Sequence, residues 1–434
     1  MLEELLPNIK VDERKWKDHP RVRVGSMKEV PAAEKMTPEA LERRNFRMNK
    51  PHILPHVYFN KEATRDTIRH FVQGIGDDNP LYTDEEYAKK SKYGKIIAPP
   101  CFLYTNQWIT LGGGFPGIHA WYSGGDWEWY KPVVVDTSLK AIAVVRDMKV
   151  RPGRKAGGGN IYIDYGDIIY AGETSNEIFG KEFYHTVWAE RDAASSSSKE
   201  RRSGKTEYTK EDWIRILEAY DTEEVRGSKP RYWEDVKVDD KLGPMIKGPL
   251  TVRDELGWLM GGGSPFFRAH KLEMKFEKAH PKALEYVKET NEADVPELVH
   301  VLDQFARNIG IEYAYDYGNQ RMSWLCNLFT NWMGDDAFLW KMSGDERVFN
   351  QMGDLTIFEG KVVKKYEDNG KYCVDIEAGA RNQRNEWSMP PNISTVILPS
   401  KEHGPVKYPD VPANIVADVK NARPLAEMIK EGIL

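Results

Sequence analysis

The run GDDNPLYTD, Gly76 to Asp84, combines residue types that can move protons. The carboxyl group of Asp77 can serve as a base when burial brings its pKa towards neutrality, and the amide of Asn79 can donate and accept hydrogen bonds. Tyr82 has a phenol with a usual pKa of about 10, so at neutral pH it donates a proton rather than accepts one. An Asp in such a loop equally suits a turn in which its side chain binds the backbone. A catalytic role and a structural role for Asp77 both stay open.

A second, diverged copy of this region lies later in the chain. ATRDTIRHFVQGIGDDNP (63–80) matches TVRDELGWLMGGGSP (251–265), and LYTDEEYAKKSKYG (81–94) matches VHVLDQFARNIGIE (299–312). In this alignment Tyr82 and His300 take the same position, and Gly262 stands where the first copy has Asp77. The first copy therefore keeps an Asp and lacks a His, whereas the second keeps the His and lacks the Asp.

The second copy supplies a different set of candidate groups. His300 could act as an acid or a base, although a lone histidine is often structural. The nearest carboxylates, Asp294 and Glu297, lie six and three residues before it. They belong to an insertion, residues 266–298, that has no counterpart in the first copy. Either carboxylate could replace the missing Asp, and an approach of Asp77 to His300 across the two copies also stays open.

The helical segment that follows each copy begins differently. Tyr317 and Gly318 directly precede NQRMSWLCNLFTNWM in the second copy. The free N–H groups at the start of this helix could bind an oxygen that gains negative charge. The first copy has Pro99 and Pro100 at the same place, before CFLYTNQWITL, and proline has no N–H to offer. The sequence therefore favours the second copy slightly as the site of chemistry.

Arg321 lies one turn into the second helix. It could bind a phosphate group or, as we favour, pair with Asp316.

Charge and cysteine content exclude several classes of function. The formal net charge is -5, with no basic stripe for nucleic acid. No His, Cys or carboxylate cluster has metal-ligand spacing. Three scattered cysteines, no apolar run of membrane-spanning length and no signal-like N-terminus predict a cytoplasmic protein.

The 434 residues divide into two similar halves. Each half has a short helical start, a longer central helix, and then segments with the alternating apolar pattern of antiparallel strands. A polar run, AASSSSKERRSGK, separates them. The predicted boundaries are an N-terminal arm (1–45), a first domain (46–192), a linker (193–226), a second domain with the insertion (227–402), and a C-terminal helical tail (403–434).

These motifs carry a resemblance to a known family. GDDNPLYTDEEYA and YGKIIAPP resemble the MaoC-like dehydratase domain, and GIEYAYDYGNQRMSWL, GDLTIFEG and VILPS are similar to the partner domain of fused acyl dehydratases. The resemblance implies an α+β tandem (double) hotdog fold, in which each antiparallel sheet wraps around a central helix. In the related R-specific enoyl-CoA hydratases, it further implies, an Asp and a His activate water and a backbone N–H holds the thioester oxygen.

The resemblance therefore implies a hydro-lyase that adds water to a 2-enoyl-CoA or removes it from a 3-hydroxyacyl-CoA. Fusion of two domains and many tryptophans predict an unusual or bulky acyl group. The expected catalytic residues are His300, Asp77, Tyr82, Asp294 and Glu297, and the expected substrate-binding residues are Asn79, Tyr317, Gly318 and Arg321. No metal or cofactor besides the coenzyme A thioester is expected, and a homodimer is the expected assembly. Alternatives are an acyl-CoA thioesterase, a carbon–carbon lyase, or a non-catalytic acyl-thioester-binding subunit.

Overall fold

The structure is a computed structural model, and it describes the greater part of the chain. The described residues are 5, 7–19, 21–22, 35–53, 59–107, 115, 117–152, 160–190, 204–281, 283–287 and 292–433. Most of the run AASSSSKERRSGK lies outside them.

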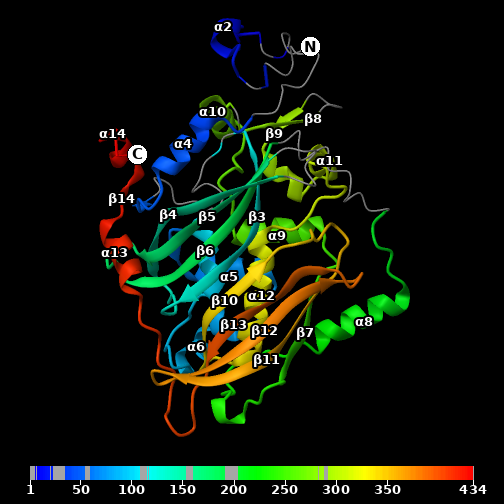
Figure 1. Cartoon of the computed structure of the whole chain (residues 1–434). Helices are drawn as coiled ribbons and strands as arrows, with labels where there is room; N and C mark the ends of the chain where they lie inside the picture. Colours follow the sequence, from blue (N-terminus) through cyan, green and yellow to red (C-terminus); the bar gives the residue numbers. More distant parts are fainter. Residues whose placement is uncertain are drawn as a thin grey trace.

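One large sheet runs through both halves (Figure 1). Its order among the described strands is β14-β1-β4-β5-β6-β3-β10-β13-β12-β11-β7, with β2 paired to β4. The long strands of the first half are β3 (His119–Trp129), β4 (Thr137–Pro152), β5 (Asn160–Gly172) and β6 (Ile178–Ala189). Those of the second are β7 (Lys241–Lys247), β10 (Phe338–Asp345), β11 (Thr356–Asp368), β12 (Lys371–Asn382) and β13 (Trp387–Ile397). The short strands are β1 (His52–Ile53), β2 (Glu62–Ala63) and β14 (Arg423–Pro424).

The two halves join at β3 and β10, which pair antiparallel from Glu128 with Lys341 to Gly124 with Asp345. Asp126 and Ser343 face each other at the middle of this pairing, and the Ser343 hydroxyl donates to Asp126 Oδ1 at 2.5 Å. Because the halves meet strand to strand, neither leaves an open edge at the junction.

The first helices of the halves, α5 (Arg65–Ile75) and α9 (Val252–Gly261), cross in close contact. A Cβ on Gly74 would lie 2.6 Å from the Gly257 carbonyl oxygen, and a Cβ on Gly261 would lie 2.4 Å from the His70 carbonyl oxygen. The two contacts are equivalent when Gly74 is matched with Gly261 and His70 with Gly257, an offset of 187 positions in both cases. The glycines therefore allow the two backbones to touch, and the contact is nearly two-fold symmetric.

The sheet curves around α12 (Gly318–Met333), the central helix of the second half (Figure 1). Nearly every residue of α12 is buried, as expected for a helix enclosed by a sheet. In the first half, the predicted helical segment forms a 3-10 helix, η2 (Pro100–Thr105), and residues 108–114 lie outside the described part. Cys101 of η2 packs against α12, with its Sγ 4.0 Å from the Met322 carbonyl oxygen.

The remaining helices lie around this core. They are α2 (Glu13–Trp16), α4 (Pro38–Phe46), α6 (Glu85–Lys90), α8 (Lys210–Asp221), α10 (Lys271–Ala279), α11 (Asp303–Asn308), α13 (Ala413–Asn421) and α14 (Leu425–Lys430). Shorter 3-10 turns are η1 (Pro80–Tyr82), η5 (Trp233–Asp235) and η6 (Pro296–His300). Helix α8 lies within the predicted linker, capped by the reciprocal pair of Thr209 and Asp212.

The insertion forms α10, the two-stranded pair β8 (Glu285–Val287) and β9 (Glu292–Asp294), and most of η6. Arg21 of the N-terminal arm holds α10 through Glu277, to which its Nη2 donates at 2.8 Å. In the C-terminal tail, β14 pairs with β1 and α13 packs on β5. No helix in the described ranges is both long and apolar enough to cross a membrane.

Candidate active site

The turns after α5 and α9 show which residues correspond between the halves. A glycine with left-handed backbone follows each helix, Gly76 (φ 65°) directly after α5 and Gly263 (φ 78°) two residues after α9. The next side chain in each half accepts a backbone hydrogen bond at 3.0 Å, Asp77 Oδ1 from Asn79 N and Ser264 Oγ from Phe266 N. Ser264 therefore takes the place of Asp77.

The predicted correspondence of Asp77 with Gly262 is thereby corrected. The sequence alignment matched the prolines Pro80 and Pro265, whereas the structure matches the glycines that end the helices. Gly262 lies one position earlier and packs under Trp258, whose ring would be 2.6 Å from a Cβ on Gly262.

The loops that follow also correspond. The 3-10 turns η1 and η6 end at Tyr82 and His300, and each is followed by an isolated β-bridge, at Ile97 and at Tyr315. These equal spacings place His300 at the position of Tyr82 and Glu297 at the position of Asn79. The first half therefore presents Asp, Asn and Tyr, and the second presents Ser, Glu and His.

Asp77 is buried in the first half and caps its own turn. Its Oδ1 accepts from Asn79 N, and its Oδ2 has no hydrogen-bond partner among the described residues. Burial raises the pKa of the Asp77 carboxyl group to about 6, and the neighbouring Lys247 ammonium opposes the shift. Lys247 is itself buried and donates to the Gly76 carbonyl oxygen at 3.0 Å.

Asn79 links the two halves. Its Oδ1 accepts from Leu81 N at 3.0 Å, and its Nδ2 donates to Asp335 Oδ1, just after α12, at 3.2 Å. The Tyr87 hydroxyl donates to the other oxygen of Asp335 at 2.6 Å. Asn79 thus holds Asp335, which follows α12, and its side chain also lines the pocket of the first half.

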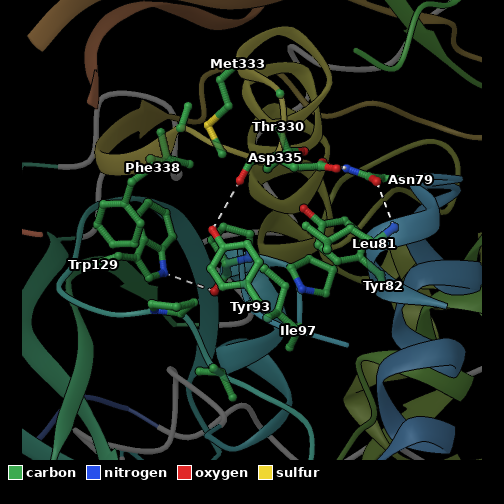
Figure 2. Close-up of a pocket in the computed structure, with 18 of the residues that line it drawn as sticks. Asn79, Leu81, Tyr82, Tyr93, Ile97, Trp129, Thr330, Met333, Asp335 and Phe338 are labelled. Atoms are coloured by element: carbon green, nitrogen blue, oxygen red, sulfur yellow. Dashed lines mark hydrogen bonds between the residues drawn. The ribbon is translucent and has the colours of Figure 1, made fainter. Parts of the chain in front are cut away.

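Tyr82 and the two prolines of the first half line a pocket of about 40 Å³ (Figure 2). Thr330 and Met333 of α12, together with Asp335 just after it, form one wall. Apolar side chains, among them Leu81, Ile97, Trp129 and Phe338, form most of the rest. Burial raises the pKa of the Tyr82 phenol far above its usual value, so it stays protonated. This first-half site lacks a base at the Tyr82 position and an N–H at Pro100.

His300 lies at the start of α12 in the second half. Its Nδ1 is 2.8 Å from the Tyr315 carbonyl oxygen, and because a carbonyl only accepts, Nδ1 carries the proton and Nε2 the lone pair. The ring stacks on Tyr317 with a centroid distance of 3.8 Å. Burial lowers the pKa of the His300 imidazole to about 3. His300 is therefore a neutral imidazole at physiological pH.

Glu297 is the carboxyl group of this second-half site. It is buried, and the Ser264 hydroxyl donates to its Oε2. The Tyr317 phenol faces the same carboxyl group. Burial raises the pKa of Glu297 to about 8, although both hydroxyl groups favour its charged form. Glu297 is therefore mostly protonated at pH 7, and it shares the Tyr317 side chain with the neutral imidazole of His300.

Comparisons with known proteins agree with this architecture. A family model described as the FAS1-like dehydratase domain region matches residues 58–163. A UPF0336 protein of Streptomyces avermitilis is 49% identical over 51 residues, 12% of this chain and 34% of that protein. One of Thermobifida fusca is 44% identical over 55 residues, 13% and 34% respectively. The chain thus spans about a third of the length of these curated relatives.

A solved structure described as a MaoC-like dehydratase aligns over 82% of this chain and 100% of its own, with a TM-score of 0.55 at 13% identity. The chain has the double hotdog fold and resembles the MaoC-like dehydratases. The fold class and the family resemblance predicted from the sequence are confirmed.

In this double hotdog protein, the other predicted site residues lie away from His300 or are engaged elsewhere. Asp294 is on β9, where its charge acts on Arg21 and Glu273. Arg321 is buried and its guanidinium binds Asp316, with Nε to Oδ2 at 2.7 Å. Its Nη1 donates to the Val348 carbonyl oxygen at 2.9 Å. Arg321 thus braces the core and does not face a phosphate group.

The two half-sites of the hotdog pair lie at opposite ends of α12. His300 contacts Tyr317 at its start, and Tyr82 shares a pocket with Thr330 near its end. A rise of 1.5 Å per residue between Tyr317 and Thr330 corresponds to roughly 20 Å. Asp77 and His300 therefore belong to separate sites, and the open alternative of a joint site is not realised.

Two side chains that the sequence analysis did not identify cover the start of α12. A Cβ on Gly318 would lie 2.4 Å from Tyr122 Cδ1 and 2.9 Å from Glu346 Oε2. The Tyr122 hydroxyl donates to Glu182 Oε1 at 2.6 Å, and burial raises the pKa of Glu182 to about 8. Glu182 lies on the same buried face of β6 as Tyr184, two residues on, and this period of two is the signal that could have revealed it.

Proposed function

We propose that the chain is a hydro-lyase for a coenzyme A thioester, adding water to a 2-enoyl-CoA or removing it from a 3-hydroxyacyl-CoA with a bulky acyl group. We assign the reaction to the second-half site. The observation that carries the assignment is that a neutral imidazole, His300, and a protonated carboxyl group, Glu297, both adjoin Tyr317 at the start of the buried helix α12. The dehydratase-region match and the MaoC-like fold support the reaction class. No cofactor besides the coenzyme A thioester is required.

In the hydration direction, His300 Nε2 takes a proton from water as the water oxygen bonds to the β-carbon of the enoyl group. The carbon–carbon double bond supplies the electron pair that takes a proton from Glu297 at the α-carbon. His300 ends as an imidazolium and Glu297 as a carboxylate, and proton exchange with solvent restores both. Dehydration is the reverse. Each group begins in the protonation state that this direction requires.

The thioester oxygen gains enolate character during the reaction and needs hydrogen-bond donors. The first N–H groups of α12, beginning at Gly318, have no partner within the helix and carry the positive end of its dipole. Tyr122 and Glu346 pack on Gly318, so we propose that Tyr122 turns aside when the thioester binds. Pro100 has no equivalent N–H, which is why we assign no such role to the first half.

The test is the absorbance of the enoyl-thioester band during incubation with a panel of 2-enoyl-CoAs of increasing acyl size. Loss of the band, with formation of the 3-hydroxyacyl-CoA, is the expected result. Release of free thiol without loss of the band would replace the proposal with a thioesterase. Binding of the thioester without turnover would favour an acyl-binding subunit, the candidate to which Tyr82 and Pro100 in the first half lend support.

We further propose a cytoplasmic homodimer. The second half carries exposed apolar side chains on α8 and α9, including Leu217, Leu256 and Met260, which suit burial against another copy. Sedimentation equilibrium tests this: a single species of one chain mass at micromolar concentration would exclude the homodimer.

A further inference from the structure

Glu255 is a carboxyl group buried in the core of the second half. It lies on α9, is fully buried, and neither of its carboxylate oxygens has a hydrogen-bond partner among the described residues. A buried carboxyl group without partners is costly for the fold, even when it is protonated. A core position in such surroundings would normally hold an apolar residue.

The first half shows which apolar residue this position takes. The glycine contacts of α5 and α9 match Gly74 with Gly261 and His70 with Gly257, and this offset of 187 makes Ile68 the equivalent of Glu255. Ile68 is fully buried in the apolar core. The same site in the same fold therefore accepts isoleucine, so packing does not require a carboxyl group there.

Glu255 faces the second-half site through Tyr317. The first turn of α9 contacts the first turn of α12, where Gln320 Nε2 donates to the Asp254 carbonyl oxygen at 3.4 Å. One turn further along the same face, Trp258 packs on the Tyr317 ring at 6.3 Å. Glu255 lies between these contacts, close enough to raise the pKa of the Tyr317 phenol.

We propose that Glu255 is a positioning residue for the proton transfer by Glu297, acting through the Tyr317 phenol; this rests on the proposed function. When Glu297 gives its proton to the substrate, the Tyr317 hydroxyl donates to the new carboxylate. The protonated Glu255 carboxyl group then donates to the Tyr317 oxygen, which still has an acceptor lone pair. No covalent bond changes at Glu255. The chain of two hydrogen bonds stabilises the carboxylate that the reaction creates.

The test compares Glu255→Ile with Glu255→Gln. Isoleucine is the residue of the equivalent position and removes the donor, whereas the glutamine amide keeps one. We expect Glu255→Ile to lower kcat by roughly tenfold or more with KM within about twofold, while its thermal midpoint is unchanged or higher. Glu255→Gln should retain kcat within about threefold. The decline of activity with rising pH should move to higher pH in Glu255→Ile, because the Glu297 carboxylate is less stabilised.

If Glu255 were purely structural, the kcat of Glu255→Ile would be at least as high as that of Glu255→Gln. That result would overturn the inference while leaving the proposed function intact. An Ile68→Val variant serves as the matched control in the first half and should not change kcat. A wild-type chain that hydrates no enoyl-CoA would overturn both proposals, so the two failures are distinguishable.

Discussion

Ser264 in the second half occupies the position that Asp77 occupies in the first, and each accepts a backbone hydrogen bond at 3.0 Å from the residue two positions on. The turn is therefore preserved without its carboxylate. Glu297, at the position of Asn79, brings a carboxyl group back to the same place, and the Ser264 hydroxyl binds it. The acid group of the second half therefore stands two residues further along the loop than Asp77 does in the first, and it shares Tyr317 with the imidazole of His300.

The protonation state of Glu297 predicts a one-sided pH profile. Because its pKa is raised to about 8, the acid form needed for hydration is lost as pH rises through 8. His300 stays neutral at any pH well above 3 and adds no acidic limb between pH 5 and 7. We expect kcat for hydration to be flat from pH 5 to 7 and to fall above pH 8. Glu297→Gln should lower kcat at least a hundredfold; a bell-shaped profile centred below pH 6 would contradict this assignment.

Asp77→Asn should leave the reaction nearly unchanged. The asparagine oxygen can still accept from Asn79 N, so the turn is retained. We expect kcat/KM within about threefold of the wild type and a similar thermal midpoint. The informative control is Asp77→Ala, which loses the turn acceptor and should cost about 1 kcal/mol of stability. A hundredfold loss of activity in the asparagine variant would move the chemistry to the first half.

Glu182 predicts a pH dependence of stability. Its pKa is raised to about 8 in the fold, so the folded protein holds a proton that the unfolded chain releases near pH 4.5. Stability from this group is therefore present at low pH and falls as pH rises towards 8. Glu182→Gln should lose less unfolding free energy between pH 5.5 and 8 than the wild type does, and the difference should be on the order of 2 kcal/mol. Denaturant unfolding at both pH values measures it, and an unchanged pH dependence would show that Glu182 is charged.

The crossing of α5 and α9 predicts opposite effects for two glycines. A Cβ at Gly74 would lie 2.6 Å from a backbone oxygen, so Gly74→Ala should cost about 1–3 kcal/mol. A Cβ at Gly257 would meet nothing closer than 3.9 Å, so Gly257→Ala should be neutral or stabilising by up to about 1 kcal/mol. Thermal unfolding of the two variants provides the comparison. Equal destabilisation would mean that the helices are further apart than described.

The double hotdog could be predicted from the sequence because the two halves repeat the same local patterns. These are the matched loops and the strands with alternating apolar residues. The partners of the site were harder to predict. The insertion, to which Glu297 was assigned, hid the correspondence of Glu297 with Asn79. The shared prolines placed the alignment two residues away from Ser264. Tyr122, Glu182 and Glu255 reach the start of α12 from distant strands and helices, and no local pattern records such contacts. For Arg321, the closeness of Asp316 in sequence was itself the informative signal.

The most direct measurement is kcat/KM for hydration of one accepted 2-enoyl-CoA by the wild type, His300→Gln and Tyr82→Phe, the last being the matched variant at the equivalent position of the other half. The account predicts a loss of roughly a hundredfold or more for His300→Gln and little change for Tyr82→Phe. Full activity of His300→Gln, or loss of activity only in Tyr82→Phe, would contradict the assignment of the chemistry to the second-half site.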